Sequence, residues 1–532
     1  MGENLIIFES CQLQIQTTRS WDYMGFSLKV PRNPIVESDI IIGHLDGGVL
    51  PELESFSDHN LGPIPKKWKG VCNGGKNFVC NKKVIGARYY LEDSALDIFG
   101  HGTHTASTAV GRVVKNANFF GIANGTARGG VPSARIATYK VCGGESCEDK
   151  DILAAFDDAI ADGVDIICAS LGSTEPLKIS KSSIAIGSFH AMEKDVLTVQ
   201  SAGNTHSYGL KTVISIAPWL FTAAASSIDR NFVNKLVLGN GRTIISSAVN
   251  SFATGKHNLK LIYGKGIGSH CNVSSAMQCI DGCIDPNLVK GNIIVCDADE
   301  VFSDIVLRAW EVNASGVILR KNKYAKEPLT SPLPTASLYE PDFRYIEYYL
   351  NSETFPSARI LKSETFQDYA PIVGSFSKKG PNKFFPEIFK PDITAPGTNI
   401  LAECPVDSLI PLKKYGVKYS ILTGTSMSSP HVVGAAAYVK SRHPDWSASA
   451  IKSSLMTTAW TMNKKYNVDA ELGYGAGHID PVKAAHPGLA MPYRGSPKPN
   501  ALSLGQMVEM RELQLFVGKM DVNVTTRRSM NY

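Results

Sequence analysis

Short apolar runs alternate with amphipathic stretches along the chain from about residue 39. A run of four to eight apolar residues bounded by glycine or polar residues is typical of a buried strand, and apolar residues three or four apart are typical of a helix. Strands are therefore expected in SDIIIGHLDGG and in residues 134–142, 165–172 and 196–204, and helices in residues 149–164 and 182–195. In the first of these helices, Ile152, Phe156, Ala159 and Ile160 recur at helical spacing.

This repeated order of strand, helix and strand indicates the fold class. Right-handed crossovers between such strands give an α/β fold, here a doubly wound parallel sheet with helices on both faces. Functional sites in such folds lie outside the carboxyl ends of the strands. Asp46 and Asn204 both fall where an expected strand ends, so we expect them at the same edge of the sheet.

The pattern changes between about residues 240 and 365, where segments such as VKGNIIVCDAD and ASGVILRKN indicate short strands with glycine and proline turns. We interpret this stretch as an inserted β-rich domain. The earlier pattern resumes near PIVGSFSKKGP (371–381), and the last forty or so residues have no clear periodicity.

Composition narrows the possible functions. A hydrophobic content of 43% with 19% charged residues over 532 residues is ordinary for a globular protein. A net charge of +5 is weak for this length, so it gives no reason to expect a nucleic-acid partner. No stretch approaches the roughly 20 apolar residues of a membrane span.

Cysteines and glycosylation triplets favour an oxidising compartment. Cys72 with Cys80, Cys142 with Cys147, and Cys283 with Cys296 form close pairs among 11 cysteines, which suggests disulfides. Sequons lie at Asn124, Asn272, Asn313 and Asn523. The first ten residues do not form a secretory signal, so the amino terminus is expected to be incomplete.

Four short stretches carry candidate chemistry. These are HLDGG with Asp46, GHGTHTAS with His101, SAGN with Asn204, and GTSMSSPH with Ser426. A nucleophilic serine needs a base, a carboxylate to hold the base, and a donor for the oxyanion, and this set supplies one candidate for each role. Singly, Asp46 and Asn204 could be turn residues and Ser426 a helix cap. His101 and His104 could be zinc ligands, although no third ligand lies nearby in the sequence.

Together these stretches resemble the subtilisin-like serine proteases, and the flanking text resembles the plant cucumisin-like subtilases. TTRSWDYMGF, KPDITAPGTNILA and GAGHIDPVKAAHPGL carry the second resemblance, which extends over about residues 12–490. It implies an inhibitory-propeptide remnant at 1–16, a catalytic domain at 17–240 and 366–490, a protease-associated insert at 241–365, and an irregular tail at 491–532. It also implies a chain truncated at both ends.

The resemblance implies residue roles as well. Asp46 orients the imidazole, His101 acts as general base and acid, Ser426 attacks the scissile carbonyl, and Asn204 donates to the oxyanion. The segments expected to contact an extended peptide are Ser170, Leu171 and Gly172, and Ser201, Ala202 and Gly203. Expected partners are polypeptide substrates and a propeptide in cis, with no cofactor, no metal and an extracellular location.

Four positions depart from the family pattern. Gly47 stands where threonine is usual, and that hydroxyl would brace the carboxylate of Asp46. His44 replaces a small apolar residue on the same strand, Leu50 stands where tryptophan is frequent, and Lys379 stands where the family has arginine in SSRGP. These departures motivate an alternative, a non-catalytic subtilase-fold paralogue that binds peptides or proteins.

Overall fold

The computed structural model describes residues 19–488, except 145, 206–208, 269–270, 299–301, 323–326, 332 and 405–417. The expected propeptide remnant (1–16) and tail (491–532) lie outside these described residues. Within them, no helix combines the length and the apolar character needed to cross a membrane.

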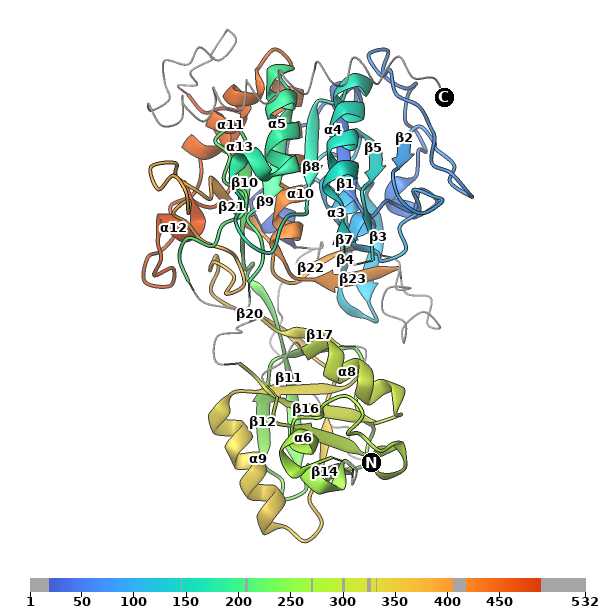
Figure 1. The fold of residues 1–532 in the computed structure, drawn as a ribbon, viewed down its shortest axis with the longest axis vertical. Coiled ribbons are helices and arrows are strands. Elements are labelled where there is room, and N and C mark those ends of the chain that lie inside the picture. Colours follow the sequence, from blue (N-terminus) through green and yellow to red (C-terminus); the bar gives the residue numbers. More distant parts are fainter. Residues whose placement is uncertain are drawn as a thin grey trace, which may run out of the picture.

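A seven-stranded sheet forms the larger lobe (Figure 1). All neighbouring strands in it are parallel, which confirms the expected α/β fold class. Their order across the sheet is β2 (Val84–Tyr89), β5 (Arg135–Lys140), β1 (Ile41–Asp46), β8 (Ile166–Ala169), β9 (Leu197–Ser201), β10 (Phe221–Ser226) and β21 (Ile393–Pro396).

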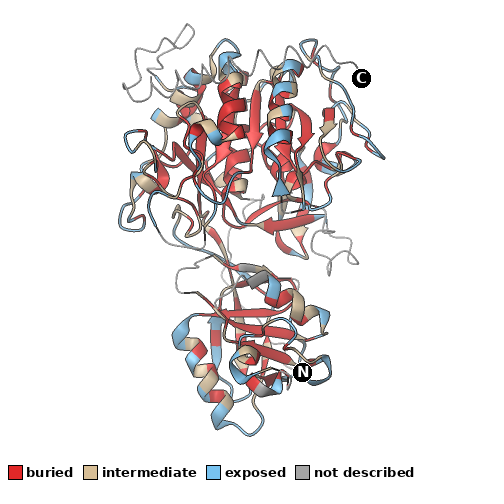
Figure 2. Ribbon diagram, in the orientation of Figure 1, coloured by how far each residue is buried: buried red, intermediate tan, exposed pale blue. Residues whose placement is uncertain are grey.

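Helices cover both faces of this sheet. Because side chains alternate along a strand, Ile42 of β1 faces one core and Ile41 faces the other. The first core contains α3 (His101–Val110) and α10 (Thr425–Arg442), and the second contains α4 (Asp149–Asp162) and α5 (Ser183–Glu193). Figure 2 shows the strands of this sheet largely buried, with exposed positions on the outer surface of α4.

A second sheet builds the smaller lobe, which lies below the first in Figure 1. Its strands are β12 (Thr243–Ser246), β11 (Arg230–Leu238), β19 (Ser357–Ile360), β14 (Leu259–Ile262), β15 (Ile293–Cys296), β16 (Gly316–Arg320) and β18 (Thr335–Leu338), with β20 (Glu364–Gln367) paired to β11. Helices α8 (Phe302–Glu311) and α9 (Glu340–Ser352) pack on it.

The two lobes share a small apolar cluster. Phe119 from β3 (Val114–Phe119) of the larger lobe packs there with Phe232 of β11 and Ile421 of β23 (Tyr419–Leu422). The Lys362 ammonium also donates to the Phe120 carbonyl across this junction, at 2.9 Å. The junction therefore has both apolar and polar contacts.

Disulfides correct one expectation. Cys72–Cys80 and Cys142–Cys147 are bonded as predicted, but Cys283 is bonded to Cys271 and Cys296 to Cys279. The predicted Cys283–Cys296 pair was wrong because β15 places Cys296 beside Cys279. Cys168 is a buried free thiol.

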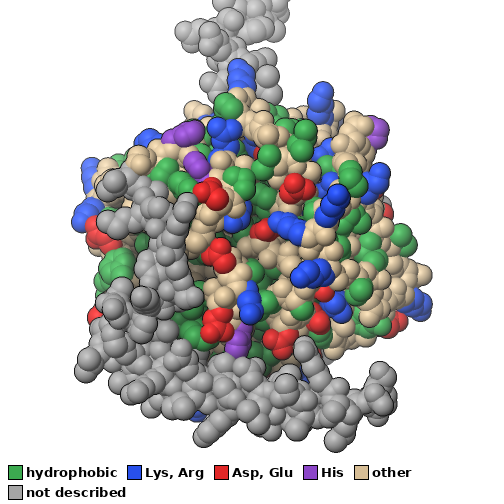
Figure 3. Space-filling model, turned by 90° about the horizontal axis from the view of Figure 1, so that it is seen from above, with side chains coloured by type: hydrophobic (Ala, Val, Ile, Leu, Met, Phe, Trp, Pro, Cys, Tyr) green, Lys and Arg blue, Asp and Glu red, His purple; other side chains and the backbone are tan. Residues whose placement is uncertain are grey.

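Charges are mixed on the outer end of the larger lobe. Figure 3 shows Lys and Arg side chains interspersed with Asp and Glu on the visible part of this face. Neither sign forms a continuous patch there.

Candidate active site

Asp46 is the last residue of β1, and its side chain contacts the first residue of α3. Asp46 Oδ1 lies 2.7 Å from His101 Nδ1 and also accepts from the Gly47 backbone N–H at 2.8 Å. Asp46 is 2% exposed, whereas the His101 side chain is 39% exposed. The arrangement fixes the His101 tautomer with Nδ1 protonated and leaves the other face of the ring accessible.

The second oxygen of Asp46 has different neighbours. Thr105 Oγ1 lies 3.1 Å from Asp46 Oδ2 and 2.8 Å from His44 Nε2, while His44 Nε2 is 3.6 Å from Oδ2. Gly47 brings no side chain to this carboxylate. Bracing of Asp46 therefore comes from Thr105 on α3 and from the backbone of Gly47.

Opposing effects set the pKa values of this pair. Burial acts to raise the pKa of Asp46, but the His101 charge and hydrogen bond, together with His44 and the Gly47 N–H, hold it below its usual value. Desolvation acts to lower the pKa of His101, but the Asp46 carboxylate outweighs it and raises that pKa. The Asp46 carboxylate therefore stabilises the imidazolium that forms when His101 accepts a proton.

Asp97 holds the amino end of α3, which carries His101. Its Oδ1 accepts from the N–H groups of Phe99 (3.0 Å) and Gly100 (2.8 Å), and its Oδ2 accepts from Thr103 N–H at 2.7 Å. Free N–H groups at a helix start need such acceptors. Gly100, at φ 82°, lies in the left-handed region that lets the chain turn into the helix.

Ser426 lies in the first turn of α10 and pairs reciprocally with Ser170. Ser426 Oγ donates to the Ser170 carbonyl, and Ser170 Oγ donates to the Ser426 carbonyl, each at 3.0 Å. Among the described residues, Ser426 Oγ and His101 share no hydrogen bond. Helices α3 and α10 do pack against each other, so both side chains are carried by neighbouring elements.

Asn204 follows β9 and contacts the start of α10. Its Oδ1 accepts from Thr425 N–H (2.9 Å) and from Thr425 Oγ1–H (2.8 Å). A Cβ placed on Gly424 would lie 3.3 Å from Asn204 Nδ2 and 3.7 Å from the Ser426 nitrogen. Two N–H donors therefore flank one position that is kept open by the absence of a side chain on Gly424.

The two expected peptide-binding segments lie at the ends of β8 and β9. Leu171 O accepts from Gln200 Nε2 at 3.1 Å, and Ala202 N–H donates to Ala223 O at 2.9 Å. A Cβ on Gly172 would lie 2.4 Å from Ile214 Cδ1, and a Cβ on Gly203 would lie 2.9 Å from the same atom. Ile214 therefore occupies the space between the two segments.

The zinc alternative finds no support in the position of His104. Its Nε2 donates to the Ile400 carbonyl of β22 (Ile400–Glu403) at 2.9 Å, and the side chain is fully buried. No group of three or more potential metal ligands occurs among the described residues.

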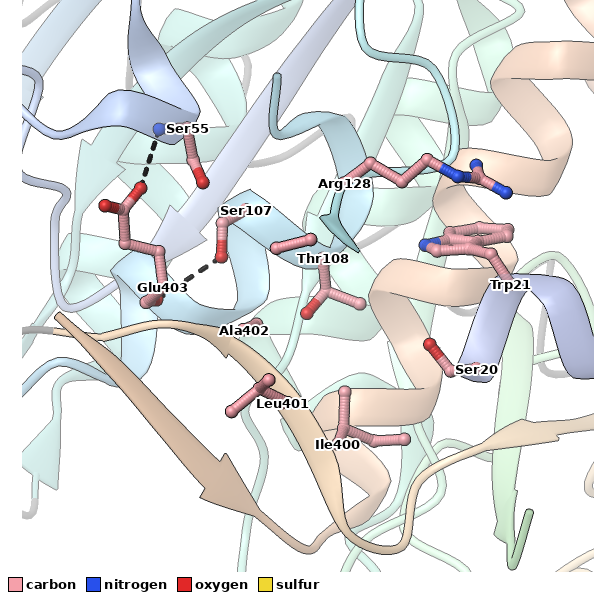
Figure 4. Close-up of a pocket in the computed structure, with 11 residues that line it drawn as sticks. Ser20, Trp21, Ser55, Ser107, Thr108, Arg128, Ile400, Leu401, Ala402 and Glu403 are labelled. Carbon is pink, nitrogen blue, oxygen red and sulfur yellow. Dashed lines mark hydrogen bonds between the residues drawn. The ribbon is translucent and has the colours of Figure 1, made fainter. Parts of the chain in front are cut away.

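A small internal cavity lies apart from these side chains (Figure 4). Ser20, Ser107, Arg128 and Glu403 help to line it, and Glu403 Oε2 accepts from Ser55 N–H at 2.7 Å. None of Asp46, His101, Asn204 and Ser426 belongs to its lining. An extended peptide paired along strand ends needs no such enclosed cavity.

Sequence reasoning named Asp46, His101, Asn204 and Ser426 as candidates but did not single out Asp97 and Thr105, which contact them or hold their helix. Asp97 precedes the helix by four residues, a spacing that could have indicated a capping carboxylate. Thr105 lies four residues after His101, on the same helix face, which was the available signal for a shared contact.

Comparisons with known proteins agree with the resemblance. The model of the Subtilase family matches residues 37–475. The subtilisin-like proteases SBT4.6 and SBT4.3 of Arabidopsis thaliana are 49% and 48% identical to this chain, covering 92% of it and 68% and 67% of their own lengths. SBT4.8 of the same plant is 45% identical over 99% of this chain and 71% of its own.

A solved structure was also matched, that of the psychrophilic subtilisin-like protease Apa1 from the Antarctic psychrotroph Pseudoalteromonas sp. AS-11. Its sequence is 16% identical to this chain, and the TM-score is 0.41. The match covers 88% of this chain and 96% of the Apa1 chain. The family assignment depends instead on the family model and the plant relatives, which span most of this sequence. This chain therefore belongs to the subtilase family and is a subtilisin-like serine protease.

Proposed function

We propose that this chain is a secreted endopeptidase that cleaves polypeptides through an acyl-enzyme. Asp46 orients His101, His101 takes the proton of Ser426, and Ser426 Oγ attacks the scissile carbonyl. The observation that carries this proposal is the 2.7 Å hydrogen bond from His101 Nδ1 to the buried carboxylate of Asp46. It leaves His101 Nε2 as the free base of the ring.

The first step requires a rotation of the Ser426 side chain. Its hydroxyl donates to Ser170 O in the resting protein and must turn toward His101 Nε2 before attack. Catalytic hydrogen bonds often form only when substrate is bound. His101 then returns the proton to the leaving amine, and water releases the acyl group by the same route.

The developing oxyanion is bound beside Gly424. Asn204 Nδ2 and the Ser426 N–H flank that position and supply two donors. Ser426 is at the amino end of the 18-residue helix α10, whose dipole favours negative charge there. We assign Asn204 as the side-chain donor because its oxygen is already held by Thr425.

Polypeptide substrates are proposed to lie along Ser170–Gly172 and Ser201–Gly203 and to pair with them through main-chain groups. A propeptide acting in cis would occupy the same edges. The smaller lobe, which includes residues 241–365, is proposed to be the protease-associated insert.

Secretion is supported by four disulfides and by exposed sequon residues Asn124, Asn272 and Asn313. The test is the location of the tagged full-length gene product in plant tissue. Retention in the cytosol would contradict this part of the proposal.

A fluorophosphonate probe tests the nucleophile directly. Correctly processed wild-type protein is expected to be labelled on Ser426 and to cleave peptides, and Ser426→Ala is expected to lose both activities. Ser441→Ala, at the far end of the same helix, is the matched control and should keep both. Folded wild-type protein that binds peptides but is neither labelled nor able to cleave them would favour the non-catalytic alternative instead.

A further inference from the structure

The surroundings of Asp46 Oδ2 contain a hydrogen-bonded chain that the proposed triad does not use. His44 lies two residues before Asp46 on β1, and Thr105 lies four residues after His101 on α3. A two-residue step on a strand and a four-residue step on a helix each keep side chains on one face. The four side chains therefore meet where β1 and α3 pack together.

The proton positions follow from the available acceptors. Among the described residues, Thr105 is the one hydrogen-bond donor to Asp46 Oδ2, because His44 Nε2 is too distant at 3.6 Å. Thr105 carries a single hydroxyl proton, and its neighbours are Asp46 Oδ2, Gly102 O (3.1 Å) and His44 Nε2. A buried carboxylate oxygen is the strongest of these acceptors.

Only one tautomer of His44 gives both Thr105 Oγ1 and Asp46 Oδ2 a hydrogen-bond partner. If His44 Nε2 carries the proton, it donates to Thr105 Oγ1 at 2.8 Å, and Thr105 donates to Asp46 Oδ2. His44 Nδ1 then accepts from the Thr138 hydroxyl at 3.5 Å. With the proton on Nδ1 instead, Nε2 would draw the Thr105 hydroxyl away and leave an anionic oxygen buried without a donor, which is costly.

We propose that His44 is a positioning residue, which acts through Thr105 to hold Asp46 in line with His101. The chain runs from His44 Nε2–H to Thr105 Oγ1, and from Thr105 Oγ1–H to Asp46 Oδ2. It fixes the outer carboxylate oxygen, so that Oδ1 stays directed at His101 Nδ1. It supplies to Asp46 the side-chain donor that Gly47 cannot provide. This role rests on the proposed function of Asp46 and His101.

The charge state of His44 suits this role. Burial lowers the pKa of His44 to about 4, so the ring is neutral where His101 titrates. Besides Asp46, His44 and His101, the titratable side chains that face this group are Asp97, before α3, and the thiol of Cys168, on β8. Asp97 accepts from the α3 backbone, and the Cys168 thiol lies 3.8 Å from Ser170 Oγ, so both have partners other than Asp46 Oδ2.

Two apolar variants, of which Thr105→Val is isosteric, separate positioning from packing. Thr105→Val and His44→Val are expected to lower kcat by about tenfold or more with little change in KM, because a hydrogen bond to a buried charge is lost. Loss of the donor concentrates charge on Oδ1, so the pKa of His101 and the acid limb of the kcat/KM profile should move to higher pH. Thr105→Ser should restore both, and Thr108→Val, a buried isostere on the same helix, should resemble wild type.

Nuclear magnetic resonance of ¹⁵N-histidine-labelled protein tests the chain without turnover. Wild-type His44 is expected as the Nε2–H tautomer, untitrated above about pH 5. The pKa of His101, read from the same spectra, should rise in the two valine variants even if no peptide is cleaved, which separates this inference from the proposed activity. An Nδ1–H tautomer in the wild type, or an unchanged His101 pKa in folded Thr105→Val, would overturn the proposal.

Discussion

At the scale of single residues, Gly424 shapes the site because it has no side chain. Gly424 has extended backbone at φ 167° and ψ 162°, which any residue adopts, so its identity is not a backbone requirement. Its role is to keep open the space between Asn204 Nδ2 and the Ser426 nitrogen. This space is where we place the oxyanion.

Gly424→Ala tests that role. The added methyl group would point between the two proposed donors and crowd the oxyanion beside them, so kcat should fall on the order of 10²-fold, as when an oxyanion donor is lost. Thermal stability should change little, and the measurement is kcat for a peptide substrate alongside a melting curve. Gly62→Ala, at an exposed glycine with open space around it, should match wild type. Full activity in Gly424→Ala would place the oxyanion elsewhere.

At the scale of elements, the site depends on how α3 begins. The Asp97 carboxylate accepts three backbone N–H groups ahead of and within its first turn, and His101 is the first residue of that helix. The direction of the imidazole is therefore coupled to this cap.

Asp97→Ala is expected to destabilise the fold by about 2 kcal/mol, because it leaves buried donors without acceptors. Peptidase activity should also fall, since the helix start moves His101 relative to Asp46. Urea unfolding and kcat measure the two effects. Asp93→Ala, which removes an exposed carboxylate four residues earlier, should change stability by less than about 0.5 kcal/mol. Equal effects of the two substitutions would contradict the capping role.

The positions of the strands and helices could largely be predicted from the sequence, whereas the contacts between them could not. The strands that end at Asp46 and before Asn204 and the helices that start at His101 and near Ser426 were predictable, because periodicity and turn residues mark them locally. The contacts of Asp46 with Thr105 and His44 were not, because they depend on how β1 and α3 pack. Cys283 likewise has three cysteines within reach in sequence (Cys271, Cys279 and Cys296), and only the fold decides that Cys271 is its partner.

At the scale of the whole molecule, buried neutral histidines link stability to pH. Burial lowers the pKa of His44 and His478 to about 4, and that of His104 and His431 to about 3. In the unfolded chain each would titrate near pH 6.5. Below that pH the unfolded state binds more protons than the folded state, so stability is present above pH 6.5 and lost as the pH falls toward 4.

The free energy of unfolding should therefore decrease by about 1.4 kcal/mol per pH unit for each of these histidines between pH 6 and 5. His101 has the opposite sign and another window: its raised pKa gives stability that is complete below pH 6.5 and is lost above its folded value. Urea titrations at several pH values measure the slope. His478→Gln should reduce the slope of the unfolding free energy against pH by about a quarter of the contribution from the four histidines. His59→Gln, at an exposed position, should leave this slope unchanged. An identical slope in His478→Gln would contradict this account.

The pairing of β11 with β20 between the two lobes affects how the sheet of the larger lobe can assemble. Strands β10 and β21 are hydrogen-bonded neighbours, yet the chain from residue 227 to 392 intervenes. Its entry and exit are joined side by side, because Arg230 of β11 is paired with Gln367 of β20. Once the smaller lobe has folded, only residues 227–229 and 368–392 separate this pair from β10 and β21, so the closure entropy that remains is smaller than that of the whole intervening chain.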